Sequence, residues 1–364
     1  MKKQIALIGV TGFGQNHLAN LLKLAGENLI DIAAAVIINP EQAADAIASL
    51  QEYQTRIYPD TDTFFAAEKG KIDLVCLPTG IDSHESLTLA ALSAGMNVLV
   101  EKPASGSEES VNRMIAAEKA SGKFVAVGFQ HAYAPEIHFL KRLILSRRIG
   151  RIVSSSVYAC WPRDDVYYAR NSWAAKRSHR GVQVLDSPLN NACAHYLNIL
   201  LFLNGGKQYT TAGAENVTGK VMRARPEIEM FDACDVTYTL DNGREARVMF
   251  AHCCKERINP KAKIVCENAV IRWSNSGWSV INNDGSVLAA GTPMQPGEAL
   301  FRTVINKLDN PLEKVYTLQN ALEHTKCVEM LDRECPICDV ESVRENGIYC
   351  VPGLEAGFTA VFGE

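Results

Sequence analysis

Two short segments of the chain carry side chains that could polarise a hydroxyl group and move its proton. The first is Val98-Leu99-Val100-Glu101-Lys102-Pro103, in which three apolar residues predict a buried strand that ends in a carboxylate, an ammonium group and a proline. In an open parallel sheet, ligands bind beyond the carboxyl ends of the strands, so Lys102 is a candidate for contact with a substrate. A Glu-Lys pair after a strand is, by itself, more often part of a solvated loop.

The second segment contains His195. A helix that begins at about Asn190 would place Asn191, His195 and Asn198 on one face. An imidazole with an ordinary pKa of about 6.5 suits proton transfer near neutral pH. Asn191 can orient a hydroxyl but cannot accept a proton, and Asp186 is the nearest carboxylate in the sequence. A single histidine in an apolar helix is usually a core residue, so catalysis requires Lys102 at the same site.

The beginning of the chain predicts a dinucleotide site. A strand predicted at Gln4–Gly9 is followed by a helix at about Gln15–Ala25, and a glycine-rich turn joins them. Such a turn brings backbone N–H groups and a helix N-terminus to a pyrophosphate. Its candidate residues are Gly9, Thr11, Gly12, Phe13 and Gly14. The next predicted strand, Asp31–Ile38, lacks the usual acidic partner for the ribose, and Asn39 is the only polar candidate, so NAD and NADP both remain open.

The order of the predicted elements indicates an α/β fold followed by an α+β fold. Predicted strands and helices alternate as far as residue 128, which is typical of a doubly wound parallel sheet, a Rossmann domain. After Gly206 the apolar residues alternate with period two, and Asp241-Asn-Gly243 predicts a hairpin turn, so a mostly antiparallel open sheet is expected. We therefore predict a dinucleotide-binding domain at 1–130 and a substrate-binding and oligomerisation domain at 131–364.

Residues 1–130 resemble the nucleotide-binding domain of the glucose–fructose oxidoreductase / inositol dehydrogenase / rhizopine catabolism (Gfo/Idh/MocA) family. The resemblance is carried by Gly9–Gly14 with His17, by Pro78-Thr79 with His84, and by Ala94-Gly95 leading to Val98 and Glu101-Lys102-Pro103. It implies a Rossmann domain that binds NAD or NADP, with Pro78, Thr79, His84 and Glu101 among the cofactor-binding residues. It also implies that Lys102 lies beside the nicotinamide and the substrate hydroxyl.

The family places an aspartate four residues before the histidine and often another three residues after it. This chain has Asn191 and Asn198 at those positions. The resemblance implies an NAD(P)-dependent oxidoreductase that acts on a secondary alcohol of a sugar, cyclitol or derivative. Lys102 would polarise the oxygen, His195 would accept its proton, and Asn191 and Asp186 would hold substrate and imidazole in place. Two alternatives are a cofactor-retaining glycosidase that oxidises a ring hydroxyl transiently and a non-catalytic sugar-sensing protein of this fold.

The segment from Tyr158 to Arg180 is rich in aromatic and hydrogen-bonding side chains. Sugars and cyclitols stack their C–H faces on aromatic rings and need polar partners for their hydroxyl groups. Tyr168, Asn171 and Trp173 are therefore candidate substrate-binding residues. The alternative is an ordinary loop with aromatic anchors.

The composition narrows the class of protein. The 364 residues are 47% hydrophobic and carry a formal net charge of −4, with no basic stripe for nucleic acid. No apolar run is long enough to cross a membrane, and we interpret the apolar run after Met1-Lys2-Lys3 as a strand. Eleven scattered cysteines, an odd number, are typical of reduced thiols in a cytoplasmic protein. A homo-oligomer formed through the open sheet is expected by resemblance.

One cysteine and histidine pattern has ligand types that suit zinc. It comprises His324, Cys327, Cys335 and Cys338. His324 and Cys327 fall in an apolar-periodic helix, where cysteine is a common core residue, so we predict no metal site.

Overall fold

The computed structural model describes residues 2–363, which form two compact units. The first contains the residues up to 105 together with 109–133 and 296–322, and the second contains 106–108, 134–295 and the residues from 323 onward. The segment 296–322 therefore returns to the first unit, an addition that the sequence did not indicate.

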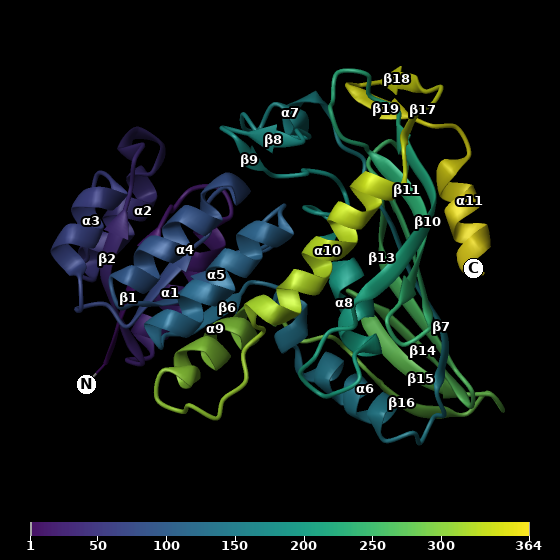
Figure 1. The fold of residues 1–364 in the computed structure, drawn as a ribbon, viewed down its shortest axis with the longest axis horizontal. Coiled ribbons are helices and arrows are strands. Elements are labelled where there is room, and N and C mark those ends of the chain that lie inside the picture. The colour runs from purple at the N-terminus through teal and green to yellow at the C-terminus, as the bar shows by residue number, and fades with distance from the viewer. Residues whose placement is uncertain (1, 364) are drawn as a thin grey trace. The chain divides into compact units, whose positions relative to one another are not determined.

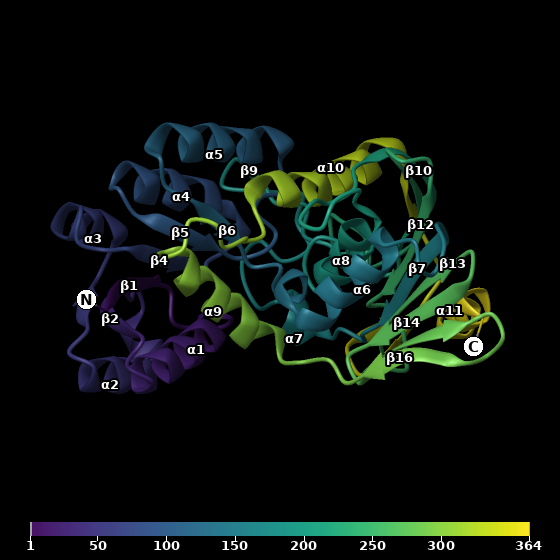
Figure 2. The ribbon, with the colours of Figure 1, turned by 90° about the horizontal axis from the view of Figure 1, so that it is seen from below.

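The first unit is built on a six-stranded sheet of order β3-β2-β1-β4-β5-β6, in which every neighbouring pair is parallel. The strands are β1 Lys3–Ile8, β2 Ile30–Val36, β3 Arg56–Tyr58, β4 Leu74–Leu77, β5 Asn97–Val100 and β6 Val125–Val127. Helices α1 and α2 lie on one side of this sheet, and α4 and α5 lie on the other (Figure 2). The parallel pairing and the helices on both sides confirm the predicted doubly wound parallel sheet. Because helices cover both faces, its strands are apolar on both faces.

The helices of this unit include the one predicted at about Gln15–Ala25. They are α1 Gly14–Gly26, α2 Ala44–Glu52, α3 Thr61–Glu68, α4 His84–Ser93, α5 Glu108–Ser121 and α9 Pro296–Lys307, with short 3₁₀ turns η1 Pro40–Gln42, η2 Ile81–Ser83 and η3 Gln130–Tyr133. The segment after Asn39 forms only the single turn η1, and α2 begins at Ala44. Helix α9 packs against α1, where Lys23 Nζ lies 2.7 Å from Glu298 Oε2.

The second unit is built on a nine-stranded sheet of order β16-β15-β14-β13-β7-β12-β11-β10-β17. Only the pairs β7–β12 and β10–β17 are parallel, which confirms the predicted, mostly antiparallel sheet. The strands are β7 Ile152–Cys160, β10 Ala214–Arg223, β11 Ala233–Leu240, β12 Glu245–Ala251, β13 Ile258–Cys266, β14 Ala269–Ser274, β15 Gly277–Asn282, β16 Val287–Gly291 and β17 Ile337–Asp339; two hairpins add β8 Ser178–His179 with β9 Val182–Gln183 and β18 Val343–Glu345 with β19 Ile348–Cys350.

Helices lie on both faces of the large sheet. The helices of this unit are α6 Pro135–Leu145, α7 Asp165–Tyr168, α8 Ala194–Asn204 and α11 Leu354–Phe362, and α10 Leu318–Glu334 begins in the first unit and continues into the second. Helix α8 packs on β7, β12 and β13, whereas α11 lies on the opposite face (Figure 1). Side chains of α11 pack on Tyr158 of β7, whose ring centroid lies 4.6 Å from that of Phe362.

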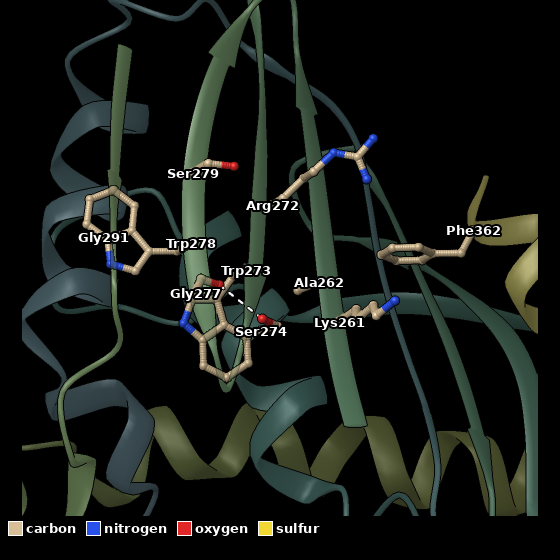
Figure 3. Close-up of a pocket in the computed structure, with 10 residues that line it drawn as sticks. All are labelled: Lys261, Ala262, Arg272, Trp273, Ser274, Gly277, Trp278, Ser279, Gly291 and Phe362. Carbon is tan, nitrogen blue, oxygen red and sulfur yellow. Dashed lines mark hydrogen bonds between the residues drawn. The ribbon is translucent and has the colours of Figure 1, made fainter. Parts of the chain in front are cut away.

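Part of the sheet next to α11 remains uncovered. A cavity of about 350 Å³ lies over β13, β14 and β15 (Figure 3). Lys261, Arg272 and Phe362 extend to one side of these strands, and the Trp278 indole lies on the other (Figure 3).

None of the eleven cysteines, all of which lie in the described part of the chain, forms a disulfide, and nine of them are buried. These nine therefore act as small apolar residues of the core. Across residues 2–363, no helix combines the length and the apolar character that crossing a bilayer would require.

Candidate functional site

The glycine turn after β1 has the backbone geometry of a phosphate cradle. Gly9 has a φ of +90°, which L side chains rarely adopt, and its N–H donates to Val36 O at 3.1 Å. A Cβ on Gly14 would lie 2.4 Å from Gly9 O, so the first turn of α1 can approach the strand end only without a side chain. Thr11, Gly12 and Phe13 are exposed between them, at the N-terminus of α1. These residues fit a dinucleotide pyrophosphate, which helix N–H groups attract.

The end of β4 lies against this turn. An ideal Cβ on Gly9 would lie 3.5 Å from Thr79 Cγ2, and one on Gly14 would lie 3.6 Å from Pro78 Cγ. The buried His84 has Nδ1 2.9 Å from Pro103 O and Nε2 3.1 Å from Thr79 O. Burial lowers the pKa of His84, and a ring nitrogen that carries a proton donates to the carbonyl oxygen that it faces. His84 thus connects the chain after β4 to the chain after β5.

Glu101 anchors the chain on which Lys102 stands. Its carboxylate is buried, with Oε1 2.9 Å from His17 Nε2 and Oε2 accepting the backbone N–H of Lys102 at 3.0 Å. Gly128 makes room for it, since a Cβ there would lie 2.5 Å from Glu101 Oε1. The peptide bond from Lys102 to Pro103 is cis, and the Lys102 side chain is partly exposed. The sequence used His17 only as a mark of resemblance, whereas the structure makes it the partner of Glu101.

The position after β2 carries an exposed asparagine. Asn39 precedes η1 and makes no capping hydrogen bond with its side chain, and Ile38 beside it is 71% exposed. An amide at this place can bond a ribose hydroxyl but adds no charge. The preference between NAD and NADP therefore stays open.

In the second unit, Asp186 is the centre of a hydrogen-bonded cluster. Its buried carboxylate accepts from Asn191 Nδ2 at 2.6 Å, from the backbone N–H of Ala175 at 2.5 Å and from Arg170 Nη2 at 2.8 Å. Ala175 and Leu185 both have positive φ, 53° and 44°. Such strained backbone persists only where the surroundings hold it, and it concentrates at functional sites. Asp186 and Asn191 are therefore joined directly, as parts of one site.

The predicted helix from Asn190 is wrong at its start, because α8 begins at Ala194. Asn191 lies in the preceding turn, where Asn190 and Asn191 bond back to Ser187 O at 3.2 and 2.9 Å. Asn190 also donates from Nδ2 to Val184 O at 3.0 Å. These side-chain and backbone bonds offer the chain an alternative to helix, which moves the helix start by one turn.

His195 and Asn198 are both on α8, which is buried along its whole length. His195 lies in the first turn and is 8% exposed, and Asn198 is 1% exposed. The next residue, Tyr196, has its ring centroid 5.8 Å from that of Trp161, which follows β7. His195 is thus placed at the end of α8 that faces the polar loops after β7.

The candidate substrate residues are distributed over two clusters. Tyr168 stacks under the guanidinium of Arg225, whose Cζ lies 4.5 Å from the ring centroid. Asn171 Oδ1 accepts from the backbone N–H of Trp173 at 3.1 Å, which shapes the local turn. The Trp173 ring lies 5.3 Å from Arg170 Cζ, on the same side as Asp186.

Tyr167 and Arg170 were not predicted from the sequence as site residues. Arg170 joins Asp186 and lies 3.9 Å from the Tyr167 ring centroid. Burial raises the pKa of Tyr167 to about 12, so this phenol stays protonated. The signal that would have found them is the Arg-x-x-x-Tyr-x-x-Arg spacing from Arg163 to Arg170, which places both guanidiniums on one ring.

Among residues 2–363, no group of three or more histidine, cysteine, aspartate or glutamate side chains could hold a metal ion. His324 Nε2 lies 3.3 Å from Asn190 Oδ1, in the interior. Cys327 and Cys335 are buried, whereas Cys338 is exposed.

Each unit supplies its own candidate groups. Lys102 with the glycine turn belongs to the first unit, and His195 with the Asp186 cluster belongs to the second. A cation beside a dinucleotide cradle can polarise an oxygen, and an imidazole with an oriented amide can accept its proton. That Lys102 and His195 meet over one substrate stays a prediction.

Two family models of known proteins match consecutive parts of the chain. The model described as an oxidoreductase family with NAD-binding Rossmann fold matches residues 3–129, and the model described as the GFO/IDH/MocA C-terminal domain matches residues 137–272. Together they match a large part of each unit and leave residues 273–364 unmatched.

Curated relatives match over part of the chain. An inositol 2-dehydrogenase of Pseudomonas savastanoi pv. phaseolicola is 36% identical over 152 residues, which are 41% of this chain and 44% of that protein. Inositol 2-dehydrogenase 4 of Saccharopolyspora erythraea is 31% identical over 150 residues, 41% of this chain and 42% of that protein. The chain thus matches less than half the length of these relatives.

Solved structures resemble the whole fold. The WlbA dehydrogenase from Bordetella pertussis, in complex with NADH and UDP-GlcNAcA, has a TM-score of 0.74 at 20% identity and covers 92% of this chain and 96% of its own. An oxidoreductase from Agrobacterium radiobacter, with NAD+, L-tartaric acid and magnesium, has a TM-score of 0.73 at 18% identity, covering 90% and 95%. At these identities the likeness establishes the fold alone.

Proposed function

Because this chain belongs to the GFO/IDH/MocA family of oxidoreductases, we propose that it transfers a hydride between NAD or NADP and a secondary alcohol of a sugar or cyclitol. The observation that carries the proposal is the anchoring of Glu101, which holds the backbone of Lys102 at the carboxyl end of β5. The inositol 2-dehydrogenases among the relatives support a polyhydroxylated substrate.

The residues of the first unit fit the cofactor. The left-handed Gly9 and the side-chain-free approach of Gly14 to Gly9 O leave room for the pyrophosphate at the N-terminus of α1. Thr11, Gly12 and Phe13 would contact the phosphates, Pro78 and Thr79 the neighbouring part of the dinucleotide, and Asn39 the adenosine ribose. When bound, the nicotinamide ring supplies the hydride acceptor.

The chain's own residues move the proton. As the C–H bond of the alcohol breaks, its O–H must lose a proton, and His195 is the base that accepts it. The Lys102 ammonium stabilises the negative charge that develops on this oxygen. Asn191 would hold a neighbouring hydroxyl, and Asp186 fixes the Asn191 amide by accepting from its Nδ2 at 2.6 Å. Asp186 already accepts from three donors, so its role is to position Asn191 and Arg170.

We also propose that two or more copies associate through the large sheet. Val153 of β7 and Val287 of β16 are 59% and 63% exposed. Apolar residues on an open sheet favour a partner over water. Sedimentation velocity of the full chain, compared with Val153→Lys, measures the oligomeric state directly, and a wild type that sediments as a monomer contradicts the proposal.

The hydride transfer is tested with purified full-length protein, NAD+ or NADP+, and a panel of cyclitols and sugars that includes myo-inositol and D-glucose. The expected result is absorbance of the reduced cofactor with at least one panel member. Release of nitrophenol from nitrophenyl glycosides without net cofactor reduction would instead identify a glycosidase. Fluorescence of NADH that does not change on addition of protein would overturn cofactor binding itself.

A further inference from the structure

The guanidinium group of Arg163 is held by aromatic rings and by no carboxylate. Its Cζ lies 4.4 Å from the ring centroid of Tyr167 and 5.6 Å from that of Trp161. The backbone N–H of Arg163 donates to His252 O at 3.1 Å, which fixes its position. Its Nε is buried and has no hydrogen-bond partner, and none of the carboxylates in the described part of the chain forms an ion pair with it.

Arg163 lies just beyond the carboxyl end of the central strand β7, at the end of the large sheet where His195 is placed. Trp161 and Arg163 follow β7, His252 follows β12, and Arg257 precedes β13. Strands β12 and β13 are the two neighbours of β7, and Cys160 pairs with both Ala251 and Ile258, so these segments leave the sheet together. The Trp161 ring reaches Tyr196, the residue after His195.

At this end of the sheet, the carboxylates of residues 2–363 do not pair with all of the positively charged arginines. Arg163, Arg170 and Arg257 surround the rings of Tyr167 and Trp161, with Arg257 Cζ 5.3 Å from the Trp161 centroid. Only Arg170 has an ion pair among the described residues, and its partner Asp186 already accepts from Asn191 and Ala175. Asp164, beside Arg163, accepts from the backbone N–H of Tyr167 at 2.9 Å and caps α7.

The pKa of the neighbouring His252 is lowered by its burial and by the same excess of positive charge. His252 is buried against these arginines, and its Nδ1 lies 3.0 Å from Trp161 O. Burial, and next the positive charge of Arg163, lower the pKa of His252 to about 3. A buried guanidinium N–H without an acceptor costs free energy.

We propose that the substrate of this site carries an anionic oxygen group, a carboxylate or a phosphate ester, and that Arg163 binds it. The proposal rests on the sugar or cyclitol dehydrogenase function proposed above and specifies its substrate class. A guanidinium stacked on aromatic rings keeps its N–H edge free and presents donors in the planar geometry that carboxylate and phosphate oxygens match. Arg257, which is exposed, adds positive potential that attracts the anion to the edge.

The experiment measures binding, so that it does not depend on turnover. D-glucuronate, D-glucose 6-phosphate and D-glucose are titrated by calorimetry into the full chain loaded with NAD+, at low and high salt. The variants are Arg163→Gln, Arg163→Lys and the matched control Arg148→Gln, which changes an exposed arginine after α6. Circular dichroism verifies the fold of each variant.

We expect at least one of the two anionic sugars to bind the wild type at least about tenfold more tightly than D-glucose, and salt to weaken this preference. Arg163→Gln should reduce the preference to less than about twofold, Arg163→Lys should retain part of it, and Arg148→Gln should leave it unchanged. The tighter anion identifies the carboxylate or the phosphate as the group. If Arg163→Gln does not fold, Arg163→Lys is used instead, and a preference below that of the wild type supports the proposal.

The inference is overturned if D-glucose binds as tightly as both anions, if none of the three sugars binds, or if Arg163→Gln keeps the preference of the wild type; where only Arg163→Lys folds, an undiminished preference in that variant overturns it. Failure of the proposed dehydrogenase function has a different signature. In that case the chain binds no NADH and reduces no cofactor, while the preference for an anionic sugar over D-glucose can still be measured without NAD+.

Discussion

His17 Nε2 lies 2.9 Å from Glu101 Oε1 in the interior of the first unit, although 84 residues separate them in the chain. The first turn of a cofactor-binding helix is thereby joined to the residue that precedes Lys102. His17 also packs edge-on against Phe301 of α9, at 4.9 Å between ring centroids. The loop that carries Lys102 is therefore supported by α1 directly and by α9 through His17.

The first prediction concerns this pair. His17→Phe should lower the free energy of unfolding by about 3 kcal/mol, because it leaves a buried carboxylate without its partner. Glu101→Met should be similarly costly, whereas His17→Phe with Glu101→Met should recover much of the loss. Urea denaturation of the four proteins measures the coupling energy, and additive losses in the double variant would contradict a direct pair.

The second prediction concerns Lys102. Lys102→Met should reduce kcat by at least about a hundredfold, because the charge that develops on the substrate oxygen loses its ammonium partner. The matched control is Lys119→Met, which removes an exposed ammonium group from α5. Steady-state kinetics with the best panel substrate measures both, and near-normal turnover of Lys102→Met removes the residue from the mechanism.

The third prediction concerns His195. His195→Asn preserves a polar side chain of similar size but cannot accept a proton, so kcat should fall at least about a hundredfold while NADH affinity stays unchanged. The split between kcat and cofactor affinity separates a base from a residue that only maintains the fold. Loss of NADH binding together with kcat would indicate the structural role.

The fourth prediction concerns Asn191, where the family resemblance leads us to expect an aspartate. Asn191→Asp would place a second carboxylate 2.6 Å from Asp186 Oδ1. Two carboxylates this close share a proton, which raises the pKa of the pair above its value in the unfolded chain. The stabilising shared proton is lost as the pH rises through that pKa, so the variant should be less stable at pH 8 than at pH 5 relative to wild type. Thermal denaturation at both pH values measures this, and parallel behaviour of the two proteins would exclude it.

The fifth prediction concerns Lys141, a fully buried lysine of α6. Its Nζ donates to Phe202 O at the end of α8 and to Thr210 O at 2.8 Å. Burial lowers the pKa of Lys141 from 10.5 to about 7. Between these values the unfolded chain holds a proton that the folded chain does not, so this residue makes the free energy of unfolding rise with pH.

Lys141→Met should therefore lack that rise, and the difference in stability between wild type and variant should grow in favour of wild type from pH 7 to pH 10. Urea denaturation across this range measures it. Lys207→Met, which changes an exposed lysine beyond α8, should follow the wild type. Equal pH dependence in Lys141→Met and wild type would contradict the assigned protonation state.

The sequence by itself determined the alternating elements of the first unit, the glycine turn and the period-two strands of the second. These features are local, because apolar periodicity, turn residues and helix signals act over a few neighbouring positions. It also indicated Lys102 and His195 through a resemblance in spacing. It placed the start of α8 four residues too early, because the side chains of Asn190 and Asn191 bond outside the helix.

Only the tertiary structure decided which distant groups share a site. Glu101 pairs with His17, Asp186 gathers Arg170, Ala175 and Asn191, and Arg163 stacks without an anion of its own. The pairs His17–Glu101 and Arg170–Asp186 join residues whose separation in the chain carries no periodic signal. They arise because strands that are remote in sequence end at one edge of a sheet, where burial forces polar groups to find partners.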